Sequence, residues 1–281
     1  MAHLRNLVCA CLERARGALH GRRMPSPASV HNARKFLKQA RASLRLMRSA
    51  IGETRYRREN RRLRAVGLVL SSARDAQVVM VTFDKTLAGL HPRRALKSLR
   101  NRLKKRVLGE RQARLDPSTR ATIIVTLDAE IDRIKRFRPS RRDIERSKKD
   151  LRRIYRKGRR TLARAIRKPS DESFHEARKG AKYLSLAMHA LETGGIEVNR
   201  KAARRARAVA HLLGQDHDLA LLRSRLAPLL DDPAIDRQQI AAMIATARRK
   251  SKAKALRTGR CLYDRKPRGF VSHAIGFPRT A

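Results

Sequence analysis

Hydrophobic residues recur at steps of three and four along most of the chain, which is the spacing of one buried face on an α-helix. In the segment 30–51 this row consists of Val30, Ala33, Leu37, Ala40, Leu44, Met47 and Ile51. The alternating pattern of a β-strand is nearly absent. The stretch ATIIVTL at 121–127 has strand propensity, but Pro117 near a first turn and the later three–four spacing favour a helix. The pattern therefore predicts an all-α protein.

Pro, Gly and capping residues divide this pattern into separate helices. The predicted helices span residues 2–19, 30–51, 55–71, 75–88, 93–109, 118–137, 141–167, 172–192, 196–213, 217–230 and 234–257. Ser29 is expected to cap the second helix, and Ser170 or Asp171 the helix that starts at 172. The end of the chain contains Gly and Pro without a helical period, so residues 259–281 are predicted to form a basic, flexible tail.

Two segments of the second half repeat segments of the first half in the same order. VHNARKFLK at 30–38 matches FHEARKGAK at 174–182, and RRLRAVGLVLSSARDAQVV at 61–79 matches RRARAVAHLLGQDHDLALL at 204–222. The offsets are nearly equal, at 144 and 143 residues. Two matches of this kind predict a duplicated helical bundle. The predicted units are one domain at 1–258, a first repeat at about 1–137 and a second repeat at about 138–258.

A row of basic side chains runs beside the apolar row of segment 30–51. It contains His31, Arg34, Lys35, Lys38, Arg41, Arg45 and Arg48, and no acidic residue lies between 30 and 48. A solvated flank that keeps the helix soluble is one explanation. If the two repeats pack about a pseudo-two-fold axis, however, two such rows face one another across a cleft and repel unless an anion lies between them. The cleft is then a candidate site for a linear polyanion.

The net charge strengthens this expectation. The sequence has 70 Lys and Arg residues against 24 Asp and Glu residues, a formal net charge of +46. Such an excess opposes compaction through self-repulsion, which a polyanionic partner would relieve. Aromatic residues make up only 4% of the chain and Trp is absent, which argues against recognition through base-stacking platforms.

Several other functions lack their usual signals. Cys9, Cys11 and Cys261 have no metal-ligand spacing and leave an odd number for disulfides, so we expect a reducing compartment and no metal site. No apolar run approaches the ~20 residues of a transmembrane helix, so we expect a cytoplasmic protein without membrane contact. The sequence offers no paired carboxylates near a metal and no nucleophile–base pair. We therefore predict neither an enzyme nor a bound cofactor.

The motif His-x-x-Arg-Lys-x-x-Lys at the start of a helix, the later Arg74-Asp75, and then FHEARKGAK and LLGQDHDLALL resemble the CHAD family. The name stands for conserved histidine α-helical domain, and the resemblance covers roughly residues 1–257. It implies two four-helix bundles related by a pseudo-two-fold axis, with a basic central cleft. It also implies binding of inorganic polyphosphate, often with targeting to polyphosphate granules. Many members are fused to a triphosphate-tunnel (CYTH) domain, for which this chain has neither the room nor the strand pattern.

The family motifs also identify candidate polyphosphate-binding residues. In the first repeat these are His31, Arg34, Lys35, Lys38, Arg61, Arg64 and Arg74, to which the cationic row adds Arg41 and Arg45. In the second repeat they are His175, Arg178, Lys179, Lys182, Arg204, Arg207 and His217. The second copy departs from the row after Lys182, where Ser185 and His189 stand at the positions of Arg41 and Arg45.

Other roles compete with this hypothesis. Electrostatics alone would also drive general nucleic-acid binding, although the basic residues follow an internal repeat rather than a helix-turn-helix, aromatic or loop element. A third alternative is a partner of a separate polyphosphate-metabolising enzyme. His31 and His175 are equally compatible with packing against a neighbouring helix, and Asp75 and Asp218 with helix capping.

Overall fold

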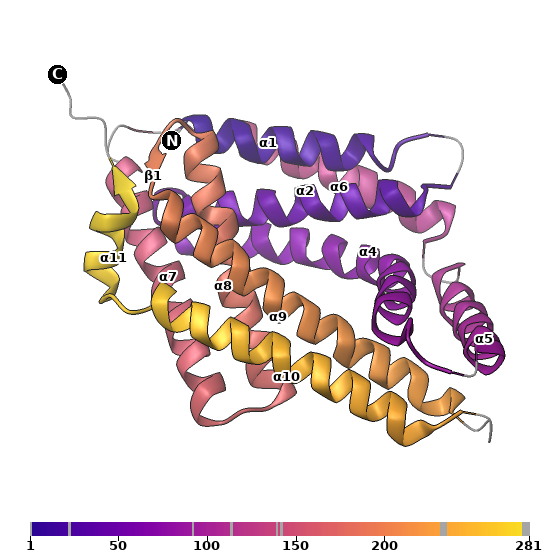
Figure 1. Cartoon of the computed structure of the whole chain (residues 1–281). Coiled ribbons are helices and arrows are strands. Elements are labelled where there is room, and N and C mark those ends of the chain that lie inside the picture. Colours follow the sequence, from indigo (N-terminus) through magenta and orange to yellow (C-terminus); the bar gives the residue numbers. More distant parts are fainter. Residues whose placement is uncertain are drawn as a thin grey trace.

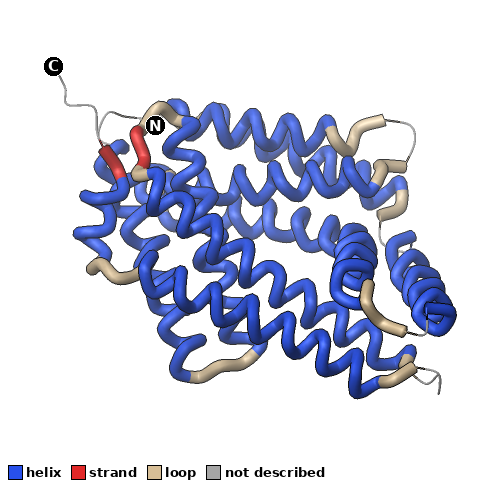
Figure 2. The backbone as a smooth tube through the Cα atoms, in the orientation of Figure 1, coloured by secondary structure: helices blue, strands red, loops and turns tan. Residues whose placement is uncertain are grey.

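The chain folds almost entirely into α-helices. The computed structural model describes residues 2–21, 24–91, 93–112, 115–138, 140, 143–230 and 235–276, with side chains placed except at 71–77, 109–112 and 143–144. Within these residues the helices are joined by turns and accompanied by one pair of very short strands (Figure 2). The all-α class predicted from the spacing of apolar residues is confirmed.

The elements follow one another along both repeats (Figure 1). The first half contains α1 (Ala2–Gly17), α2 (Pro27–Leu46), α3 (Arg48–Ile51), α4 (Glu53–Leu87), α5 (Arg93–Gln112) and α6 (Pro117–Lys135). The second half contains α7 (Asp143–Arg167), α8 (Asp171–Thr193), β1 (Glu197–Val198), α9 (Arg200–Leu226), the 3-10 turn η1 (Ala227–Leu229), α10 (Arg237–Leu262), α11 (Pro267–Ala274) and β2 (Ile275–Gly276).

The starts of the helices carry local capping signals. Ser170 caps α8 as predicted: its hydroxyl accepts a bond from the Ser173 amide at 3.1 Å, and Ser173 accepts a bond from the Ser170 amide in return. The prediction for α2 is wrong, because Ser26 rather than Ser29 is the cap. The Ser26 hydroxyl accepts a hydrogen bond from the Ser29 amide, and Pro27 occupies the first turn.

Two predicted helix breaks do not occur. α4 continues through Asp75 and α9 continues through Asp218, so neither aspartate opens a helix. The segments around these two aspartates contain no Pro. Gly214, the single glycine of α9, lowers the stability of the helix by only about 1 kcal/mol relative to Ala. The capping role considered for these two aspartates is therefore excluded.

The buried apolar side chains form two clusters, and each cluster contains residues of both repeats. The larger cluster includes Leu44 from the first repeat and Leu184 from the second. The smaller one joins the far ends of α4 and α9 to α5 and α10, through residues such as Phe83, Leu99 and Leu222. The two halves therefore interlock, and the division into two separately cored four-helix bundles is not confirmed.

The end of the chain differs from the predicted flexible tail. α10 continues to Leu262, and α11 then packs on α7, where the Phe270 ring stacks on Tyr155 with 3.8 Å between ring centroids. β2 pairs antiparallel with β1, with Val198 opposite Ile275. α11 is not predicted from the sequence, because its single short apolar face has too few repeats to establish a helical period. Residues 277–281 lie outside the described part of the chain.

A glycine contact brings α7 close to α8. A Cβ atom on Gly180 would lie 2.8 Å from the Cα of Gly158, and one on Gly158 would overlap the phenol of Tyr263. A side chain at Gly180 would push α7 and α8 apart, whereas a side chain at Gly158 would displace Tyr263. Gly180 belongs to the second copy of the repeated motif, at the position that Phe36 occupies in the first. The contact holds α7 beside the part of α8 that faces α2.

Candidate polyanion-binding cleft

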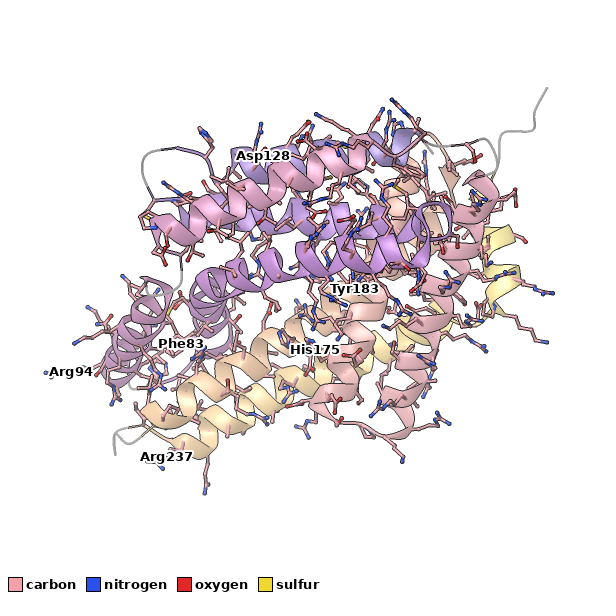
Figure 3. The ribbon with its side chains drawn as sticks, turned by 180° about the vertical axis from the view of Figure 1, so that it is seen from behind. Phe83, Arg94, Asp128, His175, Tyr183 and Arg237 are labelled. Carbon is pink, nitrogen blue, oxygen red and sulfur yellow. The ribbon has the colours of Figure 1, made fainter. Side chains whose placement is uncertain are left out.

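A cleft lies where α2 and α4 of the first repeat meet α7 and α8 of the second. One part of it, here called the first chamber, has a volume of about 370 Å³. His175 and Tyr183 lie where the purple ribbon of the first repeat meets the pink ribbon of the second (Figure 3). The cationic residues that line the first chamber are Arg34, Lys38, Arg41, Arg45, Arg64, Lys157 and Lys179.

The α2 wall presents one face of the helix. Arg34, Lys38, Arg41 and Arg45 follow one another at steps of three or four residues, so their side chains lie on the same side. Arg34 Nη1 donates to the carbonyl oxygen of Leu70 in α4 at 3.0 Å. Arg41 Nε donates to the side-chain oxygen of an α4 residue, Asn60, at 3.1 Å, and Arg45 Nη1 donates to the Arg41 carbonyl oxygen at 3.1 Å. These bonds fix the guanidinium groups along the seam between α2 and α4.

Arg45 and Tyr183 form the point where the two repeats touch inside the cleft. The Arg45 guanidinium lies over the Tyr183 ring, 3.6 Å from its centroid, in a cation–π contact. Burial raises the pKa of the Tyr183 phenol, but the charges of Arg45 and Arg41 lower it by more, so the net pKa lies below the ordinary value. This net direction indicates a concentrated positive potential at the centre of the cleft.

The α8 wall carries less charge than the α2 wall. His175, Lys179 and Tyr183 face the chamber at steps of four, and the Lys179 ammonium is paired with Glu176. Burial, followed by the charges of Arg178 and Lys179, lowers the pKa of His175. At pH 7 His175 is therefore neutral and can offer a hydrogen bond but no charge.

His217 packs beside His175 with 5.1 Å between ring centroids. Burial and the neighbouring Arg178 and His175 lower the pKa of His217 to about 4. A histidine with this pKa is neutral at pH 7, so the half-buried His217 adds no charge beside His175. His217 is not among the residues that line the first chamber.

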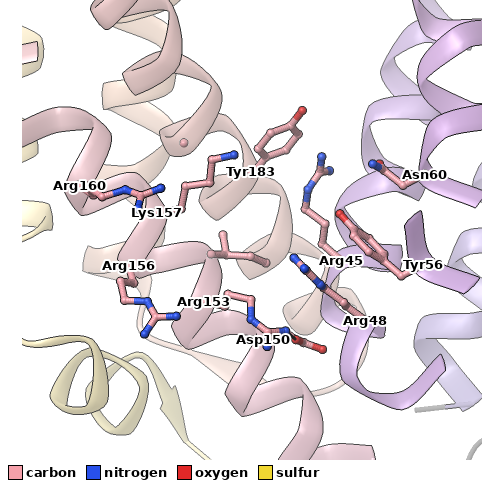
Figure 4. A pocket seen from close by; sticks show the side chains of 12 residues that line it. Arg45, Arg48, Tyr56, Asn60, Asp150, Arg153, Arg156, Lys157, Arg160 and Tyr183 are labelled. Carbon is pink, nitrogen blue, oxygen red and sulfur yellow. Dashed lines mark hydrogen bonds and ion pairs between the residues drawn. The ribbon is translucent and has the colours of Figure 1, made fainter. Parts of the chain in front are cut away.

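The cleft continues into a second chamber of about 440 Å³ (Figure 4). The two chambers share Arg45, Asn60, Lys157 and Tyr183 in their linings. The cations found only in the second chamber are Arg48 from α3 and Arg153, Arg156 and Arg160 from α7. This contribution of α7 was not among the predictions from the sequence. The signal was present, because these arginines and Lys157 form a cationic row beside the apolar row of the same helix, as in α2.

Carboxylates balance little of the positive charge in the first chamber, where Glu176 pairs with Lys179. Among the described residues that line it, none is acidic, and the second chamber has one acidic residue, Asp150. Burial lowers the pKa of Arg41, and the neighbouring cations Arg45 and Arg64 contribute to the same direction. Low-dielectric walls strengthen the field of such a group of charges, so the cleft attracts a bound anion.

Comparison with known families and structures identifies the family and the fold of the chain. The family model described as "CHAD domain" matches residues 2–227. The chain belongs to the CHAD domain family. It is also similar to the crystal structure of the CHAD domain from the plant Ricinus communis, with 21% sequence identity and a TM-score of 0.57. The match covers 94% of this chain and 91% of that one, and at this identity it shows a shared fold. A comparison with curated proteins finds no match.

The residues predicted from the CHAD motifs are only partly brought together. Arg34, Lys38, Arg41, Arg45 and Arg64 meet His175 and Lys179 in the first chamber. His31 instead lines a different cavity of about 600 Å³, together with His211 and Asp218. Five other predicted residues are exposed and line neither chamber: Lys35, Arg61, Lys182, Arg204 and Arg207.

The remaining predicted residues are Arg178 and Arg74. Arg178 is half-buried beside His175 and His217, where its charge lowers the pKa of both rings. The side chain of Arg74 lies outside the described residues, although the backbone at this position belongs to α4.

The expected symmetry of the two cationic rows is therefore wrong for this CHAD domain. On α2 the cleft is lined at positions 34, 38, 41 and 45, whereas on α8 it is lined at 175, 179 and 183. By the repeat, the latter positions correspond to 31, 35 and 39 of α2. The two helices present different faces, so equivalent motif residues do not meet across the cleft.

The described residues contain neither a candidate metal cluster nor a membrane-spanning helix. No group of three or more His, Cys, Asp or Glu side chains among them could hold a metal ion. None of the helices in the described part of the chain is long and apolar enough to cross a membrane.

Proposed function

We propose that this CHAD domain binds inorganic polyphosphate in the cleft. The observation that carries the proposal is the meeting of Arg and Lys side chains from both repeats across a cleft with little opposing negative charge. Guanidinium groups hold phosphate oxygens through paired, charge-assisted hydrogen bonds, and a chain of phosphates presents many such oxygens in series. Release of the counterions condensed on the polyanion adds to the affinity.

The shape of the cleft supports a thin polyanion over a nucleic acid. Chambers of about 370 and 440 Å³ can hold a phosphate chain but not a duplex. The aromatic side chains of the cleft are already covered on one face. Arg45 lies over Tyr183, and Arg48 lies over Tyr56 at 4.9 Å from the ring centroid. Stacking of nucleic-acid bases, which single-strand binding uses, therefore has little support here.

A competition assay at fixed salt concentration tests the proposal. The protein is loaded with a fluorescent long-chain polyphosphate, which is then displaced by unlabelled long-chain polyphosphate, tripolyphosphate, single-stranded DNA or duplex DNA. We expect the order long-chain polyphosphate, then DNA, then tripolyphosphate, with a steep loss of affinity as salt rises. Clear preference for DNA would contradict the proposal and favour general nucleic-acid binding.

We further propose that the protein acts by binding and is located where polyphosphate accumulates, in the cytoplasm and on polyphosphate granules. A protein with many phosphate contacts partitions onto a polymer of high local phosphate concentration. Recruitment of a separate polyphosphate-metabolising enzyme would be consistent with this role. Fluorescently tagged protein should co-localise with granules and disperse when polyphosphate is depleted. An unchanged distribution after depletion would contradict it.

A further inference from the structure

The second chamber contains cations that the protein itself does not neutralise. Arg48 and Arg153 are engaged by carboxylates: Arg48 forms two bonds of 2.6 Å with Glu53, and Arg153 donates to Asp150 at 2.9 Å. Within the described residues, Arg156 and Arg160 form no ion pair with an acidic side chain, and both are exposed. The chamber therefore combines two anchored arginines with two that remain available to an anion.

The single carboxylate of the second chamber is held by the protein. Asp150 is 1% exposed, and it accepts bonds from the Ser49 amide at 2.6 Å and the Ser49 hydroxyl at 2.8 Å in addition to Arg153. Burial raises the pKa of this carboxyl, while the bonds from Ser49 lower it. Because its oxygens already accept bonds from Ser49 and Arg153, Asp150 ties α3 to α7. It does not compete with a bound anion for the other cations of the chamber.

The two chambers adjoin one another and share part of their lining. Arg45, Tyr183 and Lys157 belong to both linings, and they come from α2, α8 and α7 respectively. The view into the second chamber shows the α7 cations on one side and Arg45 and Arg48 on the other (Figure 4). A flexible anion that extends from the first chamber past Arg45 therefore reaches a second set of guanidinium groups.

We propose that the second chamber is a chain-length selector, in which Arg156 and Arg160 bind the continuation of a polyphosphate chain already held in the first chamber. This inference rests on the proposed function. When one chain occupies both chambers, the second contact is intramolecular and adds affinity through a high effective concentration. A short anion such as tripolyphosphate fills one chamber at a time and gains nothing from the connection.

The test compares two double variants of α7 that remove the same charge. Arg156→Gln/Arg160→Gln changes the second chamber, and Arg164→Gln/Arg167→Gln changes two exposed arginines of the same helix outside it. Dissociation constants for long-chain polyphosphate and for tripolyphosphate are measured by titration of the full chain at one salt concentration. All four substitutions are at exposed positions, and circular dichroism verifies that each variant is folded.

We expect Arg156→Gln/Arg160→Gln to weaken long-chain binding by at least about ten-fold, because one of two linked contacts is lost. Tripolyphosphate binding should change by about two-fold, since loss of one of two equivalent sites only halves the number of sites. The control pair should weaken both ligands by a similar and smaller factor, through the general field. The inference is overturned if the chamber variant matches the control on the long chain, or if it weakens both ligands equally.

The same experiment separates this inference from the proposed function. If the wild-type protein binds neither long-chain polyphosphate nor tripolyphosphate, or if it prefers DNA, the proposed function is contradicted whatever the variants show. Wild-type protein that binds long-chain polyphosphate tightly, with no loss in the chamber variant, supports the proposed function and overturns only the chain-length selector.

Discussion

The helices α2 and α8 carry the two copies of the repeated motif and line the same cleft, yet they contribute differently to it. α2 faces the cleft with four cationic residues, whereas α8 faces it with a neutral histidine, an ion-paired lysine and a tyrosine. After Lys182 the second copy has Ser185 and His189 at the positions of Arg41 and Arg45. The missing cations of the second half are supplied by α7, which precedes α8 in the chain.

A single position explains how α7 can take this role. In α2 the motif residue is Phe36, half-buried, with Arg14 over its ring at 5.8 Å. In α8 the equivalent residue is Gly180, against which the backbone of Gly158 packs. The motif helix keeps an equivalent neighbour in each repeat, since α1 packs on α2 and α7 packs on α8, but the closeness of the packing differs. The small residue at position 180 allows α7 to approach α8 closely, and the cations of α7 then line the cleft.

The largest expected effect is on stability, when Gly180 of α8 is replaced by phenylalanine, the residue at the equivalent position of α2. Gly180→Phe should destabilise the protein by about 3 kcal/mol or more, because the ring has no space between α7 and α8. Gly180→Ala should cost about 1 to 3 kcal/mol through the clash with the Gly158 backbone. Urea denaturation followed by circular dichroism measures both changes.

Gly214 provides the control for this substitution. It lies inside α9, and a Cβ atom added there would meet nothing within 4 Å, so Gly214→Ala should stabilise the protein by about 0.5 to 1 kcal/mol. If Gly180→Ala were as stable as the wild type, the close approach of α7 to α8 would be refuted.

The next largest effect is on polyphosphate binding, and it should differ between motif cations that line the cleft and motif cations that do not. Lys38→Gln/Arg64→Gln removes two cations of the first chamber, and Lys182→Gln/Arg204→Gln removes two exposed motif cations. We expect the first pair to weaken polyphosphate binding by roughly ten-fold or more and to reduce the slope of log K against log salt by about two. Fluorescence anisotropy at several salt concentrations measures both quantities.

The exposed pair should weaken binding by less than about three-fold, with little change of slope. Equal losses for the two pairs would mean that the whole surface binds the polyanion, and the difference between α2 and α8 would then have no functional consequence.

A smaller effect is expected from His217, which the repeat aligns with Arg74. Its pKa is about 4 in the folded protein and about 6.5 in an unfolded chain, so between these values the unfolded state binds more protons. His217 therefore makes the free energy of unfolding fall as the pH decreases from about 6.5 to 4. His217→Gln should flatten this part of the stability curve, measured as melting temperature against pH. An identical acid slope in the variant would show that His217 is not held neutral by the fold.

The sequence predicted the parts of the molecule that depend on local pattern. The helices and the cationic row of α2 follow from spacing along the chain, because a helix repeats its environment every three to four residues. The continuity of α4 and α9 was missed, since Asp and Ser suggest caps but do not prevent a helix from continuing. α11 was missed because its apolar face is only one short segment.

The site depended on packing that spacing does not determine. The place of Lys157 and Arg160 follows from the Gly158–Gly180 contact, which joins two helices whose glycines look unrelated in the sequence. The separation of His31 from His175 follows from the different faces that α2 and α8 present. Both are properties of the orientation of one helix against another.

Lysine footprinting of the bound protein tests the central claim most directly. The protein is acetylated with and without saturating long-chain polyphosphate, and the modification of each lysine is quantified by mass spectrometry. Neighbouring lysines on the same helices serve as internal controls: Lys38 against Lys35 on α2, and Lys179 against Lys182 on α8. We expect Lys38, Lys157 and Lys179 to be protected several-fold, with Lys35 and Lys182 nearly unchanged. Protection of Lys35 and Lys182 equal to that of the cleft lysines would contradict binding in the cleft.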